Sequence, residues 1–156
     1  MNLESANFNK FPQSESGHDI DEKSVEPGGA VYEKEVSGAY LYRHFNYLAK
    51  KQNLPIDEIG STKELESLVR HENAEIAKLA NDILHYSTSL VAAQVAAIME
   101  FCKRDIVFIM QGSLYWKGYN YKETVEKLVI ELCPQYRASY ENVLHSDLFG
   151  AAKLVA

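Results

Sequence analysis

Apolar positions recur at intervals of three and four along residues 32–52 of this chain. The positions on this face are Val36, Tyr40, Leu41, His44, Phe45 and Leu48. Such spacing predicts an amphipathic helix with one buried face. Gly38 lies within the pattern, although glycine costs roughly 1 kcal/mol relative to alanine in a helix. We therefore expect a close neighbour or a ligand to need the space at Gly38.

Polar spacing at residues 61–64 marks the start of a second helical region. Ser61 can accept a hydrogen bond from a free backbone N–H, and Glu64 can reach back, as in a capping box. A short helix through Arg70 should follow. Residues 73–102 contain neither proline nor glycine, which predicts a long helix whose length suggests a break. Its second half is small and apolar on several faces, so we expect it to be buried.

Short apolar runs toward the end of the chain predict strands. Residues 106–110 are continuously apolar and rich in β-branched side chains, which is typical of a buried strand. Residues 139–144 are expected to form a second strand, after an amphipathic helix over 121–133. A last helix over 149–156 would follow. This order predicts an α/β fold that is helix-rich and has a small, mostly parallel sheet.

Residues 8–29 lack any such periodicity. They combine prolines and glycines with serine, asparagine and aspartate, a composition typical of turns. We expect a loop-rich segment that is mobile between residues 12 and 18.

Composition narrows the class of protein. The chain has 156 residues, 46% of them hydrophobic, which suits one domain or one large piece of a two-lobed protein. Its formal net charge of -6 repels nucleic-acid phosphates and anionic membranes, so we expect neither as a partner. No apolar stretch approaches the roughly 20 residues of a membrane span, and no secretory signal pattern is visible. A cytoplasmic location is the resulting expectation.

The remaining reactive side chains do not suggest a separate active site. The 5 histidines lack the spacing of a triad or a metal site, and His44 and His85 are expected to be structural. Cys102 and Cys133 fit buried free thiols better than a disulfide, and no metal site is expected. The aromatic residues around Trp116 fit core or interface packing better than ligand stacking.

Several short motifs, in order along nearly the whole chain, resemble the second half of the hexokinase family. Residues 2–8 resemble the family's Asn-Thr-Glu-Trp-Gly-Ala-Phe strand. The later motifs are Asp21-Glu22-Lys23-Ser24, Pro27-Gly28, Tyr32-Glu33-Lys34, Ser89-Leu90-Val91-Ala92-Ala93, Gly112-Ser113-Leu114-Tyr115 and Gly150-Ala151-Ala152. The resemblance implies that residues 1–156 form the C-terminal part of a ribonuclease-H-like, actin-like kinase lobe.

This resemblance implies sugar-binding roles for Glu4 and Glu33, whose counterparts in the family bind hydroxyl groups of the hexose. Ionised carboxylates suit that role because they accept strong hydrogen bonds from hydroxyls. The alternative for Glu33 is a solvated side chain near a helix N-terminus, where the helix dipole favours it. For Glu4, the alternative is a frayed chain end.

On the nucleotide side, the resemblance implies that Gly38, Thr62 and Gly150 line ATP, which the family uses with Mg²⁺. The alternative for Thr62 is a surface residue beside a helix cap. Gly150 would stand at the start of the last helix, where free N–H groups bind anions and ligands.

The pattern departs from the family in the parts that carry catalysis. The family's phosphate-binding loop and the segment with its catalytic aspartate have no counterpart, so no catalytic residue is assigned. Gln111 replaces an aspartate of the family. Residues 146–149 replace a glycine-rich loop. We expect the chain alone to be inactive.

Three functions remain open at this stage. The first is the C-terminal portion of a longer ATP-dependent kinase that phosphorylates the 6-hydroxyl of a hexose, with glucose as the first candidate and an N-terminal lobe as the missing partner. The second is a non-catalytic, hexokinase-like module for sugar sensing or partner binding. The third is a helical interaction protein whose matches are accidental. An exposed half-cleft would also favour a homo-oligomer.

Overall fold

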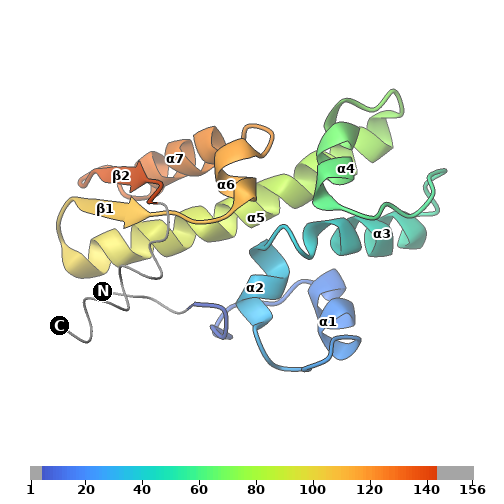
Figure 1. Ribbon diagram of the computed structural model, residues 1–156, viewed down its shortest axis with the longest axis horizontal. Coiled ribbons are helices and arrows are strands. Elements are labelled where there is room, and N and C mark those ends of the chain that lie inside the picture. Colours follow the sequence, from blue (N-terminus) through green and yellow to red (C-terminus); the bar gives the residue numbers. More distant parts are fainter. Residues whose placement is uncertain (1–4, 144–156) are drawn as a thin grey trace. The chain divides into compact units, whose positions relative to one another are not determined.

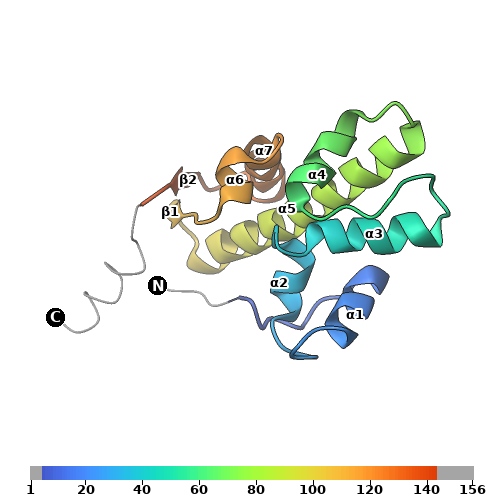
Figure 2. The ribbon, with the colours of Figure 1, turned by 45° about the vertical axis from the view of Figure 1, so that its right-hand side comes forward.

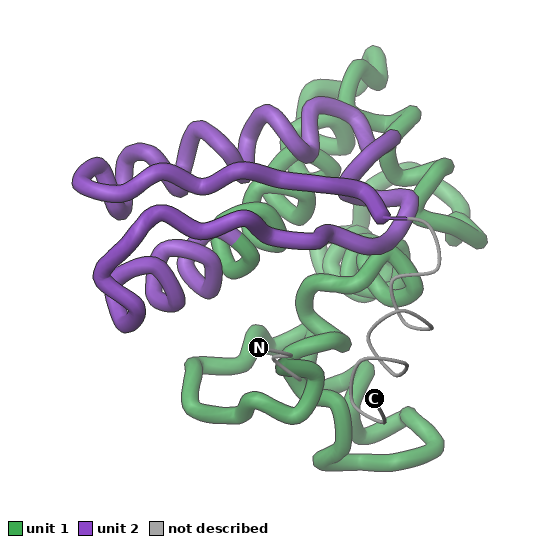
Figure 3. The backbone as a smooth tube through the Cα atoms, turned by 60° about the vertical axis from the view of Figure 1, so that its left-hand side comes forward, with its two compact units in different colours: residues 1–91 green, residues 92–156 purple. Residues whose placement is uncertain are grey.

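The computed structural model describes residues 5–143 of the chain. Its elements are α1 (Glu15–Glu22), α2 (Val31–Val36), α3 (Leu41–Lys51), α4 (Thr62–Ser67), a 3-10 turn η1 (Leu68–Arg70), α5 (Ala74–Cys102), β1 (Ile106–Ile109), α6 (Ser113–Lys117), α7 (Tyr121–Leu132) and β2 (Ala138–Glu141) (Figure 1). The backbone divides into unit 1, residues 1–91, and unit 2, residues 92–156 (Figure 3).

The first helix of unit 1, α1, was not expected from the sequence. The segment expected to be a loop contains α1, and Ser14 caps it by accepting a hydrogen bond from the Gly17 N–H at 2.9 Å. Serine is a favoured N-cap because its hydroxyl satisfies a free donor of the first turn. Gly17 and Ile20 are buried, so the helix is held against its neighbours α2 and α3 (Figure 2).

The helix expected over residues 32–52 is two helices. α2 ends at Val36, Ser37 is extended with φ -78° and ψ 140°, and α3 starts at Leu41. Gly38 therefore lies in the turn between helices rather than inside one, which corrects the expectation of a helical glycine. The apolar periodicity crosses the break because both helices turn their apolar residues inward, so the pattern alone did not show it.

α4 begins with the expected cap. Ser61 Oγ accepts from the Glu64 N–H at 3.2 Å, and Glu64 Oε1 accepts from the Ser61 hydroxyl at 2.9 Å. Glu64 also accepts a hydrogen bond from a backbone N–H, but the donor is Gly60, one residue before the N-cap Ser61. The distance from Gly60 N to Glu64 Oε2 is 3.1 Å. The capping box is therefore confirmed with a shifted backbone partner.

α5 runs without interruption from Ala74 to Cys102, so the expected break does not occur. Asn73 Oδ1 caps it by accepting from Glu75 N–H at 2.9 Å. Within unit 1, the Tyr32 hydroxyl donates to Leu90 O at 2.9 Å, which joins α2 to α5. None of the helices in residues 5–143 combines the length and hydropathy that a membrane crossing needs.

Unit 2 contains a small sheet in which β1 and β2 run parallel, with Ile106 opposite Ala138 and Ile109 opposite Glu141. α6 and α7 connect the strands, so the predicted parallel α/β unit is confirmed. We expected β1 to be buried on both faces, but only one face is covered. Its side chains alternate in burial, and Val107 and Ile109 are 58% and 54% exposed. An apolar run in a strand thus buries only the face that another element covers.

Candidate functional site

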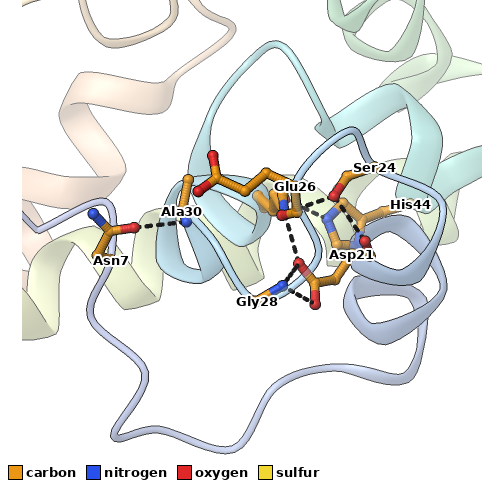
Figure 4. A network of polar contacts seen from close by, with 8 residues as sticks. Asn7, Asp21, Ser24, Glu26, Gly28, Ala30 and His44 are labelled. Carbon is orange, nitrogen blue, oxygen red and sulfur yellow. Dashed lines mark hydrogen bonds and ion pairs between the residues drawn. The ribbon is translucent and has the colours of Figure 1, made fainter.

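The start of α2 is built against the segment that follows Glu4. Ala6 O accepts hydrogen bonds from Tyr32 N–H at 3.0 Å and Glu33 N–H at 3.4 Å. Asn7 Oδ1 accepts from Ala30 N–H at 2.7 Å (Figure 4). The N-cap position of α2 is Ala30, which makes no side-chain cap hydrogen bond, so the segment near the N-terminus satisfies these donors instead.

This arrangement brings together backbone regions that lie far apart in the sequence. Glu4 is outside the described residues. Ala6, two positions later, is hydrogen bonded to the backbone of Glu33. The structure therefore places the chain that follows one predicted sugar residue beside the other.

Glu33 itself is exposed on the first turn of α2. No side chain or backbone group in residues 5–143 forms a hydrogen bond or ion pair with its carboxylate. An ionised carboxylate in this state has its acceptor positions open to water or to a ligand.

Lys34, the next residue, is buried, and its ammonium is fully hydrogen bonded, in contrast to the exposed Glu33 carboxylate. Its side chain is 4% exposed, and its Nζ lies 2.6 Å from Asp21 Oδ1, 2.9 Å from Ser24 Oγ and 2.9 Å from Glu26 O. The Lys34 ammonium lowers the pKa of the Asp21 carboxyl below its usual value, and the Gly28 N–H adds to this while burial opposes it. Lys34 thus joins α2 to the end of α1 and to the loop between them.

Glu35 is fully buried and is held by Ser14. Its Oε1 accepts from Ser14 N–H at 2.8 Å, and its Oε2 accepts from the Ser14 hydroxyl at 2.8 Å. Gly17 makes room for it, since a Cβ at that position would lie 1.9 Å from Glu35 Oε1. The second buried charge of α2 is therefore fixed to the start of α1.

His44 is the buried structural histidine that we expected. Its Nε2 lies 2.8 Å from Lys34 O, and its Nδ1 lies 2.7 Å from Ser16 Oγ. Because a carbonyl only accepts, Nε2 carries the proton, and in the neutral ring Nδ1 accepts from the Ser16 hydroxyl. Both nitrogens are engaged, so His44 packs α3 against α1 and α2.

Two of the three predicted nucleotide residues lie together. Thr62 Oγ1 donates to Gly38 O at 2.5 Å, although the residues are far apart in sequence. Thr62 is buried at the first position of α4, so it is not the surface residue of the alternative interpretation. The third residue, Gly150, lies outside the described residues.

The fit of this pair to a nucleotide is only partial. The hydroxyl proton of Thr62 is committed to Gly38 O, so this hydroxyl does not donate to a phosphate oxygen in this arrangement. Among the described residues, no group of three His, Cys, Asp or Glu side chains could hold a metal ion. We therefore derive no step through ATP or Mg²⁺ from these residues.

Unit 2 has a shallow surface hollow that sequence reasoning did not predict. It has a volume of about 380 Å³ and is lined by Gln111, Gly112, Ser113, Trp116, Lys117, Asn142 and Val143. Gly112 and Ser113 belong to one of the motifs that resemble the hexokinase family, so that motif was the only sequence signal that pointed to this region. Sequence reasoning also gave no role to Lys34 and Glu35, whose burial was the unexpected feature.

An aromatic cluster lies next to this hollow. Tyr115 contacts Trp116 edge-on at 5.0 Å between ring centroids, and Tyr140 lies 5.7 Å from Tyr115 and 6.1 Å from Phe108. Tyr115 is 4% exposed, which confirms core packing for this part of the cluster. Cys102 and Cys133 are free thiols, as expected, but only Cys133 is buried, whereas Cys102 is partly exposed.

The comparisons with known proteins agree on one relationship. No protein-family model matches the chain. The Hexokinase-like 1 protein of Arabidopsis thaliana is 25% identical over 205 aligned positions, which take in 100% of this chain and 42% of that protein. A crystal structure of hexokinase matches with a TM-score of 0.74 and 18% identity, over 91% of this chain and 41% of that one.

A second structure, a hexokinase from Schistosoma mansoni complexed with glucose, matches with a TM-score of 0.66 and 18% identity. It covers 83% of this chain and 38% of its own. The chain therefore spans less than half the length of these relatives, in their C-terminal part. The resemblance is confirmed in sequence and in fold: the chain is similar to the C-terminal part of these hexokinases and has the fold of that part.

Proposed function

We propose that this chain is the C-terminal portion of an ATP-dependent hexose kinase, which transfers a phosphoryl group to the 6-hydroxyl of a hexose. In that enzyme, Glu33 and Glu4 bind the sugar, and Gly38, Thr62 and Gly150 contribute to the nucleotide cleft. Glucose is the first candidate substrate, since one of the matched hexokinases is complexed with it. An N-terminal lobe supplies the remaining parts.

The observation that carries this proposal is the state of Glu33. The two charged residues that follow it on α2 are buried and fully engaged, whereas the Glu33 carboxylate is exposed and has no partner among the described residues. Sugar hydroxyls donate well to such a carboxylate, and hydrogen bonds to charged groups contribute about 1.5–3 kcal/mol. Ala6, two positions after Glu4 in the sequence, is hydrogen bonded to the backbone of Glu33.

The chain alone is expected to be inactive because its sequence lacks the family's base and phosphate loop. In the complete enzyme, ATP would supply the phosphoryl group, Mg²⁺ would neutralise charge on its phosphates, and an aspartate outside this chain would accept the proton of the sugar hydroxyl. This chain's own contribution is to bind and orient the hexose through carboxylates. Phosphoryl transfer depends on the missing lobe.

The second candidate is a non-catalytic sugar-sensing or partner-binding module. Two observations favour it: Gln111 stands in the hollow of unit 2 where the family has an aspartate, and the Thr62 hydroxyl is committed to Gly38. Both changes weaken a nucleotide site and leave Glu33 untouched. This candidate therefore predicts hexose binding without any kinase context.

The test of the sugar site is a calorimetric titration of the 156-residue chain with glucose. We expect binding that Glu33→Gln weakens by at least about 1 kcal/mol, roughly fivefold, because a neutral amide is a poorer acceptor. Glu58→Gln, at an exposed position in the loop after α3, is the matched control and should bind as the parent does. Equal affinities for Glu33→Gln and the parent would count against the assignment.

The mass of the native polypeptide in its source cells separates the two candidates. A mass roughly double 17.7 kDa or more supports a kinase with a further lobe. A mass of 17.7 kDa combined with glucose binding supports the module. Glucose-dependent ATP turnover that stays with the purified short chain would contradict the expected inactivity.

A further inference from the structure

The ammonium of Lys34, the residue after Glu33, ties α2 to the end of α1 and to the loop between these helices. Its partners are a carboxylate at the end of α1, a hydroxyl and a carbonyl in the loop that follows, at 2.6–2.9 Å. An ammonium has three donor hydrogens, so all of them are used here. With its side chain 4% exposed, Lys34 cannot itself serve as a surface charge for a ligand.

Asp21 transmits this restraint to the residues just before α2. Its Oδ1 and Oδ2 accept from Gly28 N–H at 3.1 Å and 3.0 Å, and Gly28 has φ 81°, a left-handed conformation that favours glycine. Two residues later, Ala30 N–H donates to Asn7 Oδ1. Figure 4 shows the contacts of Asp21 with Gly28 and, apart from them, the hydrogen bond between Asn7 and Ala30.

The rotation of α2 about its axis is set by two neighbouring buried anchors. Successive residues of a helix point roughly 100° apart, so fixing Lys34 and Glu35 in the interior leaves residue 33 pointing outward. Lys34 is bound to the end of α1 and Glu35 to its start, through Ser14. A six-residue helix has too few turns to hold this orientation by itself.

We propose that Lys34 is a positioning residue of the hexose site: its buried ammonium fixes the Glu33 carboxylate relative to the segment that follows Glu4. This inference rests on the proposed function, because Glu33 is there the group that binds the sugar. Lys34 touches no substrate and acts only through the helix and the loop that it holds.

The test compares Lys34→Met with Lys51→Met in the full 156-residue chain. Methionine keeps much of the apolar stem and removes the charge. Lys51 is the matched control, since it forms an ion pair with Glu15 in the same unit but is 53% exposed. The two measurements are glucose affinity by calorimetry and hydrogen exchange of the Tyr32 and Glu33 amides, which donate to Ala6 O.

We expect Lys34→Met to weaken glucose binding at least about tenfold, because a displaced Glu33 carboxylate loses its charge-assisted hydrogen bonds to the sugar hydroxyls. The two amides should exchange faster, while the buried Phe45 and Leu65 keep the exchange rates of the parent, which separates positioning from general loss of structure. Lys51→Met should match the parent in both measurements. Ser24→Ala, which removes one acceptor, serves as a milder variant if Lys34→Met does not fold.

Two results would overturn the inference. One is parental exchange at Tyr32 and Glu33 in a folded Lys34→Met or Ser24→Ala chain. The other is faster exchange with unchanged glucose affinity. If the parent chain itself binds no glucose, this chain alone does not form the proposed sugar site, and the exchange rates alone decide whether Lys34 fixes the start of α2.

Discussion

The two units of this chain have different interiors. Every buried polar or charged side chain among the described residues, tyrosine and cysteine aside, lies in unit 1: Ser16, Lys34, Glu35, His44, Thr62, Ser87 and Thr88. In unit 2, the described interior is aliphatic and aromatic, and the buried hydroxyls of Tyr115 and Tyr140 have no hydrogen-bond partner.

The difference suggests that unit 1 depends on the orientation of its hydrogen-bonded side chains, whereas unit 2 depends on how well its side chains fill the interior. Hydrogen-bonded charges fix the separation and orientation of the groups that make them, so they suit a region that must hold a binding carboxylate in place. Aromatic packing fixes volume and tolerates small polar changes. The predictions below test this contrast, beginning with the largest expected effect.

The largest effect is expected from Asp21→Asn. It leaves the Lys34 ammonium buried without its counter-charge, and breaking a buried ion pair from one side costs about 3–5 kcal/mol of unfolding free energy. The double variant Asp21→Asn/Lys34→Met, which removes both charges, should recover most of the loss. Urea unfolding followed by circular dichroism measures both. A loss below ~1 kcal/mol in Asp21→Asn would show that the pair is not essential to unit 1.

A smaller effect of unusual sign is expected from Gly17→Ala. Alanine normally stabilises a helix by roughly 1 kcal/mol relative to glycine, but here the new Cβ would lie 1.9 Å from Glu35 Oε1. The carboxylate must move away from Ser14, so we expect a net destabilisation of about 2 kcal/mol.

The control for this substitution is Gly60→Ala. Its Cβ would meet Glu64 Oε1 at an ordinary 3.6 Å, so thermal unfolding should be close to that of the parent. A Gly17→Ala chain as stable as Gly60→Ala would mean that Glu35 adjusts without loss.

The smallest effect at neutral pH is expected in unit 2. Tyr140→Phe removes a hydroxyl that has no partner, so the unfolding free energy should stay within about 1 kcal/mol of the parent. A loss well above that value would reveal a hydrogen bond to this hydroxyl and erase the contrast between the units.

Alkaline pH sharpens the same comparison. Burial raises the pKa of Tyr140 to about 12 from its usual 10, and it raises that of Tyr115 as well. The folded state therefore holds these protons more tightly than the unfolded state does. Their contribution to the unfolding free energy is fully present below pH 10 and is lost as the pH rises toward 12. Tyr140→Phe should make this decrease smaller. Urea midpoints across the alkaline range measure it.

Features set by neighbouring residues were predictable from the sequence. The cap at Ser61 and the strand at residues 106–109 depend on residues within a few positions, and both are confirmed. α1 was missed because its stability depends on Glu35, 21 residues after Ser14. The break at Ser37 was missed because the apolar period continues across it.

The site shows the same limit. Glu33 was identified through a resemblance, and its exposure is compatible with the assigned role. The burial of Lys34 and Glu35 could not be read from the sequence, because charged residues are rarely buried and their partners belong to α1 and its loop. The assigned roles of Glu4, Glu33, Gly38, Thr62 and Gly150 all stay predictions, and Glu4 and Gly150 also lie outside the described residues.

The contact between Gly17 and Glu35 has a consequence for how such sequences can diverge. A Cβ at position 17 would lie 1.9 Å from Glu35 Oε1 and 3.0 Å from Ser14 Oγ, so a side chain there requires Glu35 to move or to be replaced by a shorter residue. In related sequences, a larger residue at 17 should therefore be found only together with a shorter one at 35. The two positions therefore form a coupled pair.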